Sequence, residues 1–371
     1  MGPLKGVKVI EIAGIGPAPF CAMLLADMGA DVIRVERANA PQTGFALDSR
    51  FEVLNRGRRS IALDLKAEHD VRILKELIAK ADILFEGYRP GVMERLGLGP
   101  ADCWDVNPRL VYGRMTGFGQ DGPLARAAGH DINYIALTGA LDAIGAKNGP
   151  PIPPLNLVGD FGGGGMMLAM GLLAAYIEAQ KSGKGQVVDA AMVDGATLLM
   201  AGIYGLKAAG LWGGARGENL LDGGAPWYGV YETADGRHIA LGAIEPRFYQ
   251  EFLRLAEIDP ATIPDQHDKA RWPELRQALE RVIGRLTLEQ WRERLEGTDA
   301  CFAPILTMDE APSHPQMVER NSFVNVDGVL QPAPAPRFSR TPSSVRRPPP
   351  KPGEHTTEIL GDWGVKLEPI A

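Results

Sequence analysis

The chain is poor in cysteine and carries no excess of positive charge. Its three cysteines, Cys21, Cys103 and Cys301, lie far apart among 371 residues. They provide neither a disulfide framework nor the close spacing of metal ligands, so we expect apolar packing residues in a reducing compartment. A formal net charge of -7 argues against a general nucleic-acid or membrane-surface binder, because such proteins usually carry a basic excess.

The sequence is also expected to lack a secretory leader and an apolar run long enough to cross a membrane. The first residues enter a strand-like segment directly, without a basic region or a small-residue cleavage site. The longest apolar stretch begins at Met166, contains Glu178, and is expected to be too short to cross a bilayer. These features predict a cytoplasmic protein without membrane insertion.

The first half of the chain alternates strand-like and helix-like segments. This order predicts an α/β fold with a doubly wound parallel sheet in a Rossmann-like large domain. A long helix is expected over 161–181, and the segment VVDAAMVDG after it reads as a strand that continues into a helix. The five earlier strands are expected at 7–12, 31–36, 59–65, 81–87 and 109–117.

The pattern changes near Leu221. Two alternating runs flank Asp235-Gly236, a strong hairpin signal, and three helices follow. We therefore expect a smaller α+β domain over 224–325. The large domain would comprise 1–223 and be completed by 326–371, where a proline-rich strap either runs back over it or remains disordered, and a short helix ends the chain.

The segment GIGPAP, residues 14–19, follows the first strand and has the layout of a dinucleotide-binding turn. The fingerprint requires Gly or Ala where Pro19 stands, and two prolines remove N–H donors that a pyrophosphate would use, so a nicotinamide cofactor is disfavoured. Basic residues near the expected strand ends favour a phosphorylated adenine ligand instead, although any one of them can be an ordinary surface charge. They are Arg34, Arg37, Arg56, Arg58, Arg59, Lys66, Arg89 and Arg95.

Three titratable residues stand in contexts that suit acid/base chemistry or a plain helix cap. His130 follows a glycine at the start of an apolar helix, where the dipole favours the neutral imidazole that a base needs, and Asp131 is the expected N-cap. Asp160 ends a strand-like segment and precedes four glycines, which let a ligand approach the backbone at a cost in helix stability. Glu245 precedes Pro246 at a helix start, and nothing local makes it catalytic.

Long ordered blocks from Leu4 to the GEHT of the tail resemble the family III CoA-transferase superfamily, and more narrowly its α-methylacyl-CoA racemase branch. The resemblance implies a Rossmann-like large domain, a small domain and an interlocked-ring homodimer, with the active site between the large domain of one subunit and the small domain of the other. The blocks are GIGPAPFCAMLLADMGADVIRVER, NRGRRSIALDLK, EGYRPGVMERLGLGP, GHDINYIALTGAL, PPLNLVGDFGGGG, GKGQVVDAAMVDG, LDGGAPWYGVYETADG and ALGAIEPRFY.

The resemblance also implies residue roles. His130 and Asp160 would interconvert (2R)- and (2S)-2-methylacyl-CoA by proton transfer at C2 through an enolate, and Glu245 would orient His130. No metal or cofactor would be needed, because CoA is part of the substrate. The positions implied for CoA binding are Arg37, Leu63, Asp64, Leu65, Gly87, Tyr88, Arg89, Arg95, Gly129, Asp131, Ile132, Asn133 and Tyr134.

A second reading within the superfamily is CoA transfer between carboxylates, with Asp160 as the nucleophile. The histidine at position 130 and the LDGGAP and GAIEP segments are typical of the racemase branch, whereas transferases carry a longer glycine flap in the small domain. The methionines of residues 166–170 with Met192 and Met200 would form an adaptable acyl pocket in fatty-acid metabolism, or else ordinary helix core. The sequence leaves the preferred acyl chain open.

Overall fold

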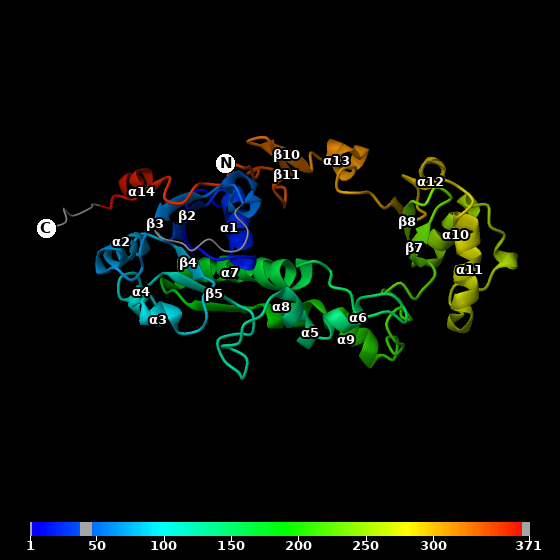
Figure 1. Cartoon of the computed structure of the whole chain (residues 1–371), viewed down its shortest axis with the longest axis horizontal. Helices are drawn as coiled ribbons and strands as arrows, with labels where there is room; N and C mark the ends of the chain where they lie inside the picture. Colours follow the sequence, from blue (N-terminus) through cyan, green and yellow to red (C-terminus); the bar gives the residue numbers. More distant parts are fainter. Residues whose placement is uncertain (1, 38–46, 366–371) are drawn as a thin grey trace. The chain divides into compact units, whose positions relative to one another are not determined.

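The computed structural model describes residues 2–37 and 47–365. These residues form two compact units (Figure 1). The first unit contains the described residues up to Thr138, Leu155–Leu199 and those from Pro315 onward, and the second contains Gly139–Pro154 and Met200–His314. The unit boundaries therefore differ from the expected 223/224 and 325/326, because residues 139–154 and 200–223 belong with the second unit and 315–325 with the first.

A six-stranded parallel sheet organises the first unit, as the sequence predicted. The strand order is β3-β2-β1-β4-β5-β6. β3 ends at Ala62, earlier than expected, because the backbone N–H groups of Lys66 and Ala67 bond back to Asp64 and form a turn. The strands are β1 (Lys8–Ile12), β2 (Asp31–Glu36), β3 (Arg59–Ala62), β4 (Ile83–Glu86), β5 (Val111–Thr116) and β6 (Val187–Ala191).

This strand order places a topological switch point between β1 and β4. In an open parallel sheet, ligands bind beyond the carboxyl ends of the strands at such a point. The loop after β1 carries GIGPAP, and the loop after β4 carries EGYRPG. These two loops therefore flank the position where the fold favours a ligand.

Helices cover both faces of the sheet because successive strand residues point to opposite sides. Ile10 of β1 packs in the cluster that contains Leu74, whereas Val9 packs in the cluster that contains Leu25 and Leu168. The helices of this unit are α1 (Pro17–Asp27), α2 (Glu68–Ile78), α3 (Val92–Arg95), α4 (Pro100–Trp104), α5 (Asp131–Leu137), α7 (Met167–Ser182), α8 (Met192–Leu199), α13 (Pro315–Glu319) and α14 (Thr356–Asp362).

The C-terminal strap is bound to the first unit and is not free. After the hairpin β10 (Phe323–Val326) and β11 (Val329–Pro332), Ser344 donates its backbone N–H to Asp27, and Arg347 accepts one from Gly57. Helix α14, red in Figure 1, then buries Ile359 against the core cluster of β3. The described residues from Pro315 onward thus belong to the first unit.

Four of the expected phosphate-binding arginines are instead buried in ion pairs. Arg34 and Arg58 both face the buried carboxylate of Glu11, at 2.5 and 3.3 Å. Arg56 pairs with Asp27 at 2.6 Å, and Arg59 pairs with three acidic side chains. A buried guanidinium requires such partners, so the interpretation as ligand-binding groups is wrong for these four.

Residues Leu157–Ser182 form one continuous helix of 26 residues, whose first part, η3 (Leu157–Met166), is a π-helix. By length and composition this helix is apolar enough to span a membrane, so the expectation of too short a segment is wrong on that count. Leu168 and Leu172 pack into the sheet, as in a core helix. The strand-like segment expected before Asp160 is a turn and the first turn of η3.

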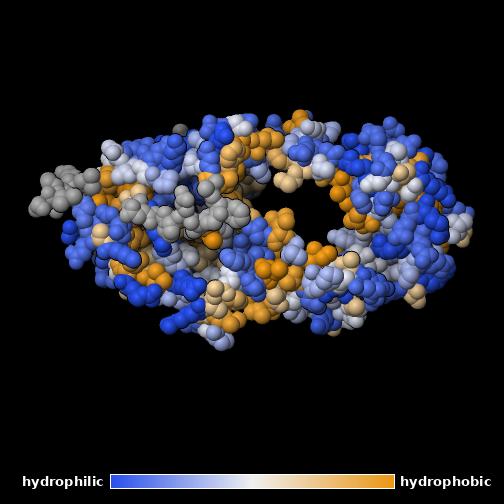
Figure 2. Space-filling view, viewed as in Figure 1, coloured by the Kyte–Doolittle hydropathy of each residue, from blue (hydrophilic) through white to orange (hydrophobic). Residues whose placement is uncertain are grey.

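One face of this helix is exposed among the residues that the structure describes. Met166 and Met170 are 53% and 61% exposed, and Leu198 of the neighbouring helix α8 is 58% exposed. Figure 2 shows apolar surface around α8. Contiguous apolar surface of this kind marks an interaction site on a protein.

The second unit contains the expected hairpin and helices. β7 (Tyr228–Glu232) and β8 (His238–Gly242) pair across the Asp235-Gly236 turn, and β9 (Phe302–Pro304) adds a third antiparallel strand. Thr287 and Gln290 form the predicted capping box. The helices are α6 (Ala140–Ala143), α9 (Ala201–Ala208), α10 (Pro246–Leu255), α11 (Trp272–Ile283) and α12 (Leu288–Leu295), and the core centres on Trp227, Phe252 and Trp291.

Candidate active site

Several positions expected to bind CoA meet at the carboxyl edge of the sheet. Arg37 follows β2, residues 63–65 follow β3, and residues 87–89 follow β4. The Arg37 guanidinium lies 5.6 Å from the centre of the Tyr88 ring, a cation–π distance. Since β1 lies between β2 and β4, this pair bridges the switch point.

In the ALDLK segment, residues 62–66, two of the three side chains expected to bind CoA are buried. Leu63 and Leu65 are buried in the core cluster, at 3% and 9% exposure. Asp64 is exposed, and its backbone N–H donates to Asp70 Oδ2 at 2.7 Å. The Leu63 side chain is therefore packed in the core, whereas Leu65 also lines a hollow beside Arg95, and Asp64 is accessible.

A buried carboxylate that the sequence reasoning missed shapes the GYR turn. Glu86 ends β4 at 4% exposure, and one of its carboxylate oxygens accepts the backbone N–H of Tyr88 at 2.6 Å. Burial raises the pKa of Glu86 to about 7. The signal was an acidic residue inside the buried strand ILFE.

His130 lies at the start of α5, with its side chain exposed. His130 is itself the N-cap, and Asn133 Oδ1 accepts its backbone N–H at 3.0 Å. The expectation that Asp131 is the cap is wrong, because Asp131 is the first helical residue and its carboxylate points to another helix. The hydroxyl of buried Tyr134 donates to the Gly129 carbonyl and closes the turn.

Asp160 lies within the first turn of η3 and is not its cap, which is Asn156. The Asn156 side chain donates to Asp160 Oδ2 at 3.1 Å. Burial raises the pKa of Asp160, the Asn156 hydrogen bond lowers it, the Asp131 charge raises it, and His130 lowers it, with a net upward shift. A half-buried carboxyl with a raised pKa suits proton donation as well as abstraction.

The GIGPAP turn borders this carboxylate. A Cβ atom at Gly16 would lie 3.1 Å from Asp160 Oδ2, and Gly16 has φ +68°, a conformation that favours glycine. The absence of a side chain at Gly16 thus leaves space for the Asp160 carboxylate beside the GIGPAP turn.

The glycine run after Asp160 serves helix packing. A Cβ at Gly163 would stand 2.5 Å from the backbone N of Ala196 in α8, and one at Gly165 would stand 2.7 Å from the Pro17 carbonyl in α1. These glycines therefore let η3 approach two helices, which differs from the expected approach to a ligand. A π-helix at this point is typical of functional sites.

The structure brings His130, Asp131 and Asp160 together in the first unit and leaves Glu245 in the second. Glu245 is the exposed N-cap of α10. Within residues 2–37 and 47–365, no cluster of three or more His, Cys, Asp or Glu side chains could hold a metal ion.

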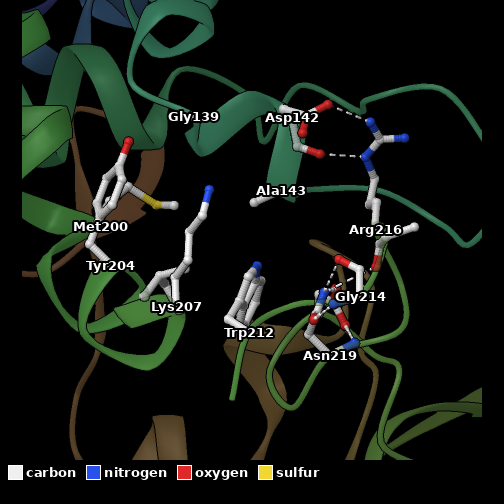
Figure 3. Close-up of a pocket in the computed structure, with 13 residues that line it drawn as sticks. Gly139, Asp142, Ala143, Met200, Tyr204, Lys207, Trp212, Gly214, Arg216 and Asn219 are labelled. Atoms are coloured by element: carbon white, nitrogen blue, oxygen red, sulfur yellow. Dashed lines mark hydrogen bonds and ion pairs between the residues drawn. The ribbon is translucent and has the colours of Figure 1, made fainter. Parts of the chain in front are cut away.

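The second unit contains a cavity of about 200 Å³ (Figure 3). Met200, Tyr204, Lys207 and Trp212 line it, and Arg216 pairs with Asp142 at 2.9 Å on one side. Met200, one of the expected acyl-pocket residues, thus lines a cavity that contains neither His130 nor Asp160. The candidate acid/base site is elsewhere, in the first unit.

Residues 4–356 match CoA-transferase family III. The chain is 46% identical over 371 residues to alpha-methylacyl-CoA racemase of Mus musculus and 44% identical over 372 residues to that of Homo sapiens, which covers 99% of this chain and 95% of each relative. It is 30% identical to succinyl-CoA:glutarate CoA-transferase of Homo sapiens, over 96% of this chain and 85% of that one. The crystal structure of a CAIB/BAIF family protein from Brucella suis superposes with a TM-score of 0.84 at 26% identity, over 98% of this chain and 99% of the other.

Proposed function

The chain belongs to CoA-transferase family III, and we propose that it is a racemase that interconverts (2R)- and (2S)-2-methylacyl-CoA thioesters. The observation that carries this proposal is that His130 and Asp160 stand at the starts of two helices in contact, close enough for the His130 charge to act on Asp160. Stereoinversion through a planar intermediate needs two acid/base groups, one for each face. The identity to relatives named as racemases exceeds that to relatives named as transferases.

In the proposed mechanism one of the two side chains removes the C2 proton and the other returns a proton to the opposite face. For the opposite enantiomer the roles are exchanged. The raised pKa of Asp160, to which burial contributes most, supports its part as the acid in one direction. No metal or redox cofactor enters these steps.

The enolate oxygen needs hydrogen-bond donors as charge develops on it. The N–H groups of Gly159 and Asp160 already donate to the Asp131 carboxylate, so these two groups are not available to the enolate oxygen. Asp131 and Ile132 are the first residues of α5, where backbone N–H groups have no acceptor inside the helix. We therefore assign the oxyanion donors to the start of α5.

CoA would bind along the carboxyl edge of the sheet, with Arg37 and Tyr88 beside the switch point. Arg95 lines a hollow of about 510 Å³ together with Lys66, Arg72 and Lys75. Cationic side chains around one hollow suit the phosphates of CoA. Binding energy at this distance from C2 serves to position the thioester.

The acyl chain would lie on the exposed apolar side chains next to Asp160. Ile15 is 76% exposed in the turn beside Gly16, and Met166 and Met170 are exposed on the same helix as Asp160. Met192, in contrast, is buried in the core, so it does not belong to this surface.

We further propose that two copies interlock as a cytoplasmic homodimer. The uncovered apolar face of η3, α7 and α8 supports a second copy as its partner. In this arrangement Glu245 of the small domain would orient His130 in the other subunit.

The alternative function is CoA transfer between carboxylates, with Asp160 as the nucleophile that forms an acyl anhydride and then a thioester. It is favoured by the family itself, which includes transferases at 30% identity over nearly the whole chain.

To separate the two functions, one enantiomer of a 2-methylacyl-CoA is incubated with the protein, with and without labelled succinate. Loss of optical purity without succinate supports the racemase. Stable optical purity with CoA appearing on succinate establishes the transferase and overturns the proposal.

A further inference from the structure

The buried carboxylate of Asp131 has a role that CoA contact does not explain. Asp131 is 5% exposed, so its side chain faces the interior. Its Oδ2 accepts the backbone N–H groups of Gly159 at 2.6 Å and of Asp160 at 2.7 Å. One side chain thus binds the backbone of the proposed acid/base residue and adjoins the other, His130, in sequence.

These bonds connect the starts of two helices. Asp131 is the first residue of α5, and Gly159 and Asp160 lie in the first turn of η3. The contact also explains Gly159, because a Cβ there would stand 2.6 Å from Asp131 Oδ2. The backbone of Asp160 is therefore held at a fixed place relative to α5, which begins immediately after His130.

A buried carboxylate costs free energy unless its oxygens are fully bonded. Asp131 Oδ2 has two donors, but Oδ1 is buried with no hydrogen-bond partner among the described residues. A neutral side chain would avoid that cost. The retained charge therefore points to a role in the chemistry.

We propose that Asp131 is a positioning residue: it fixes the Asp160 backbone against the start of α5 and keeps a negative charge beside the Asp160 carboxyl. The inference rests on the proposed function. The charged groups that act on Asp160 are Asp131 and His130, both at the start of α5, and the charges of both aspartates also raise the pKa of Tyr134. From the GIGPAP turn, the contact is the uncharged Gly16.

The test compares Asp131→Asn and Asp131→Ala with Asp105→Asn, which removes an exposed carboxylate at the end of α4. Racemisation is measured against pH in both directions. We expect Asp131→Asn to lower kcat by roughly 10- to 100-fold with little change in KM, because small misplacements are costly. In the direction in which Asp160 removes the proton, the acid limb of the pH profile should move to lower pH, because the charge that raises the pKa of Asp160 is gone.

Asp131→Ala should lose more activity, and Asp105→Asn should match the wild type. A role limited to folding would change stability and leave the acid limb in place, and that result overturns the inference. Gly159→Ala perturbs the same contact without a charge change, so it should lower kcat without moving the limb, and unchanged kcat contradicts the positioning.

If the wild type does not racemise, the proposed function fails on its own. The titration of Asp160 by ¹³C NMR in wild type and Asp131→Asn then decides the inference separately. An unchanged Asp160 titration overturns it, and a titration shifted to lower pH supports it.

Discussion

Gly16 stands against the carboxylate of Asp160, because a Cβ atom at Gly16 would lie 3.1 Å from Asp160 Oδ2. A turn with the layout of a dinucleotide-binding loop is therefore the wall of an aspartate site. Pro17 and Pro19, the two prolines that weaken the dinucleotide fingerprint, lie in the first turn of α1, which begins directly after Gly16. The sheet has the switch point of a dinucleotide-binding fold, but the group that lies against the turn after β1 is the carboxyl group of Asp160.

Gly16→Ala should impair catalysis more than binding. The new Cβ would press on Asp160, and the alanine backbone would have to adopt φ +68° and ψ -116°, at a cost of roughly 1–3 kcal/mol in stability. We expect kcat to fall by roughly 10- to 100-fold, with CoA affinity by calorimetry unchanged. Gly14→Ala is the control, since no atom lies within 4 Å of its Cβ position. Equal kcat in the two variants would show that the Gly16 contact is irrelevant.

His130→Ala and Asp160→Ala should each abolish racemisation and leave CoA binding intact. Both side chains are at helix starts and are not part of the core clusters, so the fold should tolerate their removal. Chiral chromatography of the hydrolysed product gives the rate, and calorimetry gives the affinity. Racemisation at the wild-type rate in either variant would break the two-base mechanism.

Glu86→Gln should stabilise the protein at high pH. Burial raises the pKa of Glu86 to about 7 from the ordinary 4.5 of a glutamate, so the folded state holds this proton more tightly than the unfolded chain. The wild type therefore loses stability as the pH rises from about 4.5 to about 7, and the loss persists above that.

Gln keeps an oxygen that can accept the Tyr88 N–H but has no charge to bury. The gain in Tm over wild type should be small at pH 5 and larger at pH 8. Exposed Glu293→Gln is the matched control and should show no such trend. A gain for Glu86→Gln that does not depend on pH would refute the assignment.

Arg58→Ala should strongly destabilise the first unit. Arg58 is fully buried and lies 3.3 Å from the buried carboxylate of Glu11, so the change leaves that carboxylate with less compensation. The expected loss is about 3–5 kcal/mol in urea unfolding. The control Arg271→Ala breaks an exposed pair and should leave the midpoint unchanged. A loss for Arg58→Ala no greater than for the control would mean that the buried pair contributes nothing.

Local patterns in the sequence predicted much of the fold. The strands of the large sheet, the Asp235-Gly236 hairpin and the Thr287 capping box depend on neighbouring residues, and the structure confirms them. The position of the strap also followed, since a proline-rich segment with a terminal apolar helix needs a surface to cover.

What the sequence could not show depends on distant partners. The pairing of Arg58 with Glu11 and the bonds from Asp131 to Gly159 and Asp160 join residues 28 or more positions apart. Arginines destined for ion pairs look the same in a sequence as arginines that bind phosphate. The π-helical start of η3 likewise packs closely on α1 and α8, a contact between distant segments that no local propensity encodes.

The central claim is two-base proton transfer at C2, and exchange with solvent tests it most directly. One enantiomer of a 2-methylacyl-CoA is incubated with the protein in D2O without a second carboxylate, and deuterium at C2 is followed together with optical purity. The account predicts that deuterium enters C2 as optical purity is lost, with the inverted enantiomer labelled from the first turnovers. Retention of the C2 proton and of optical purity, with CoA transfer once a carboxylate is added, would contradict it.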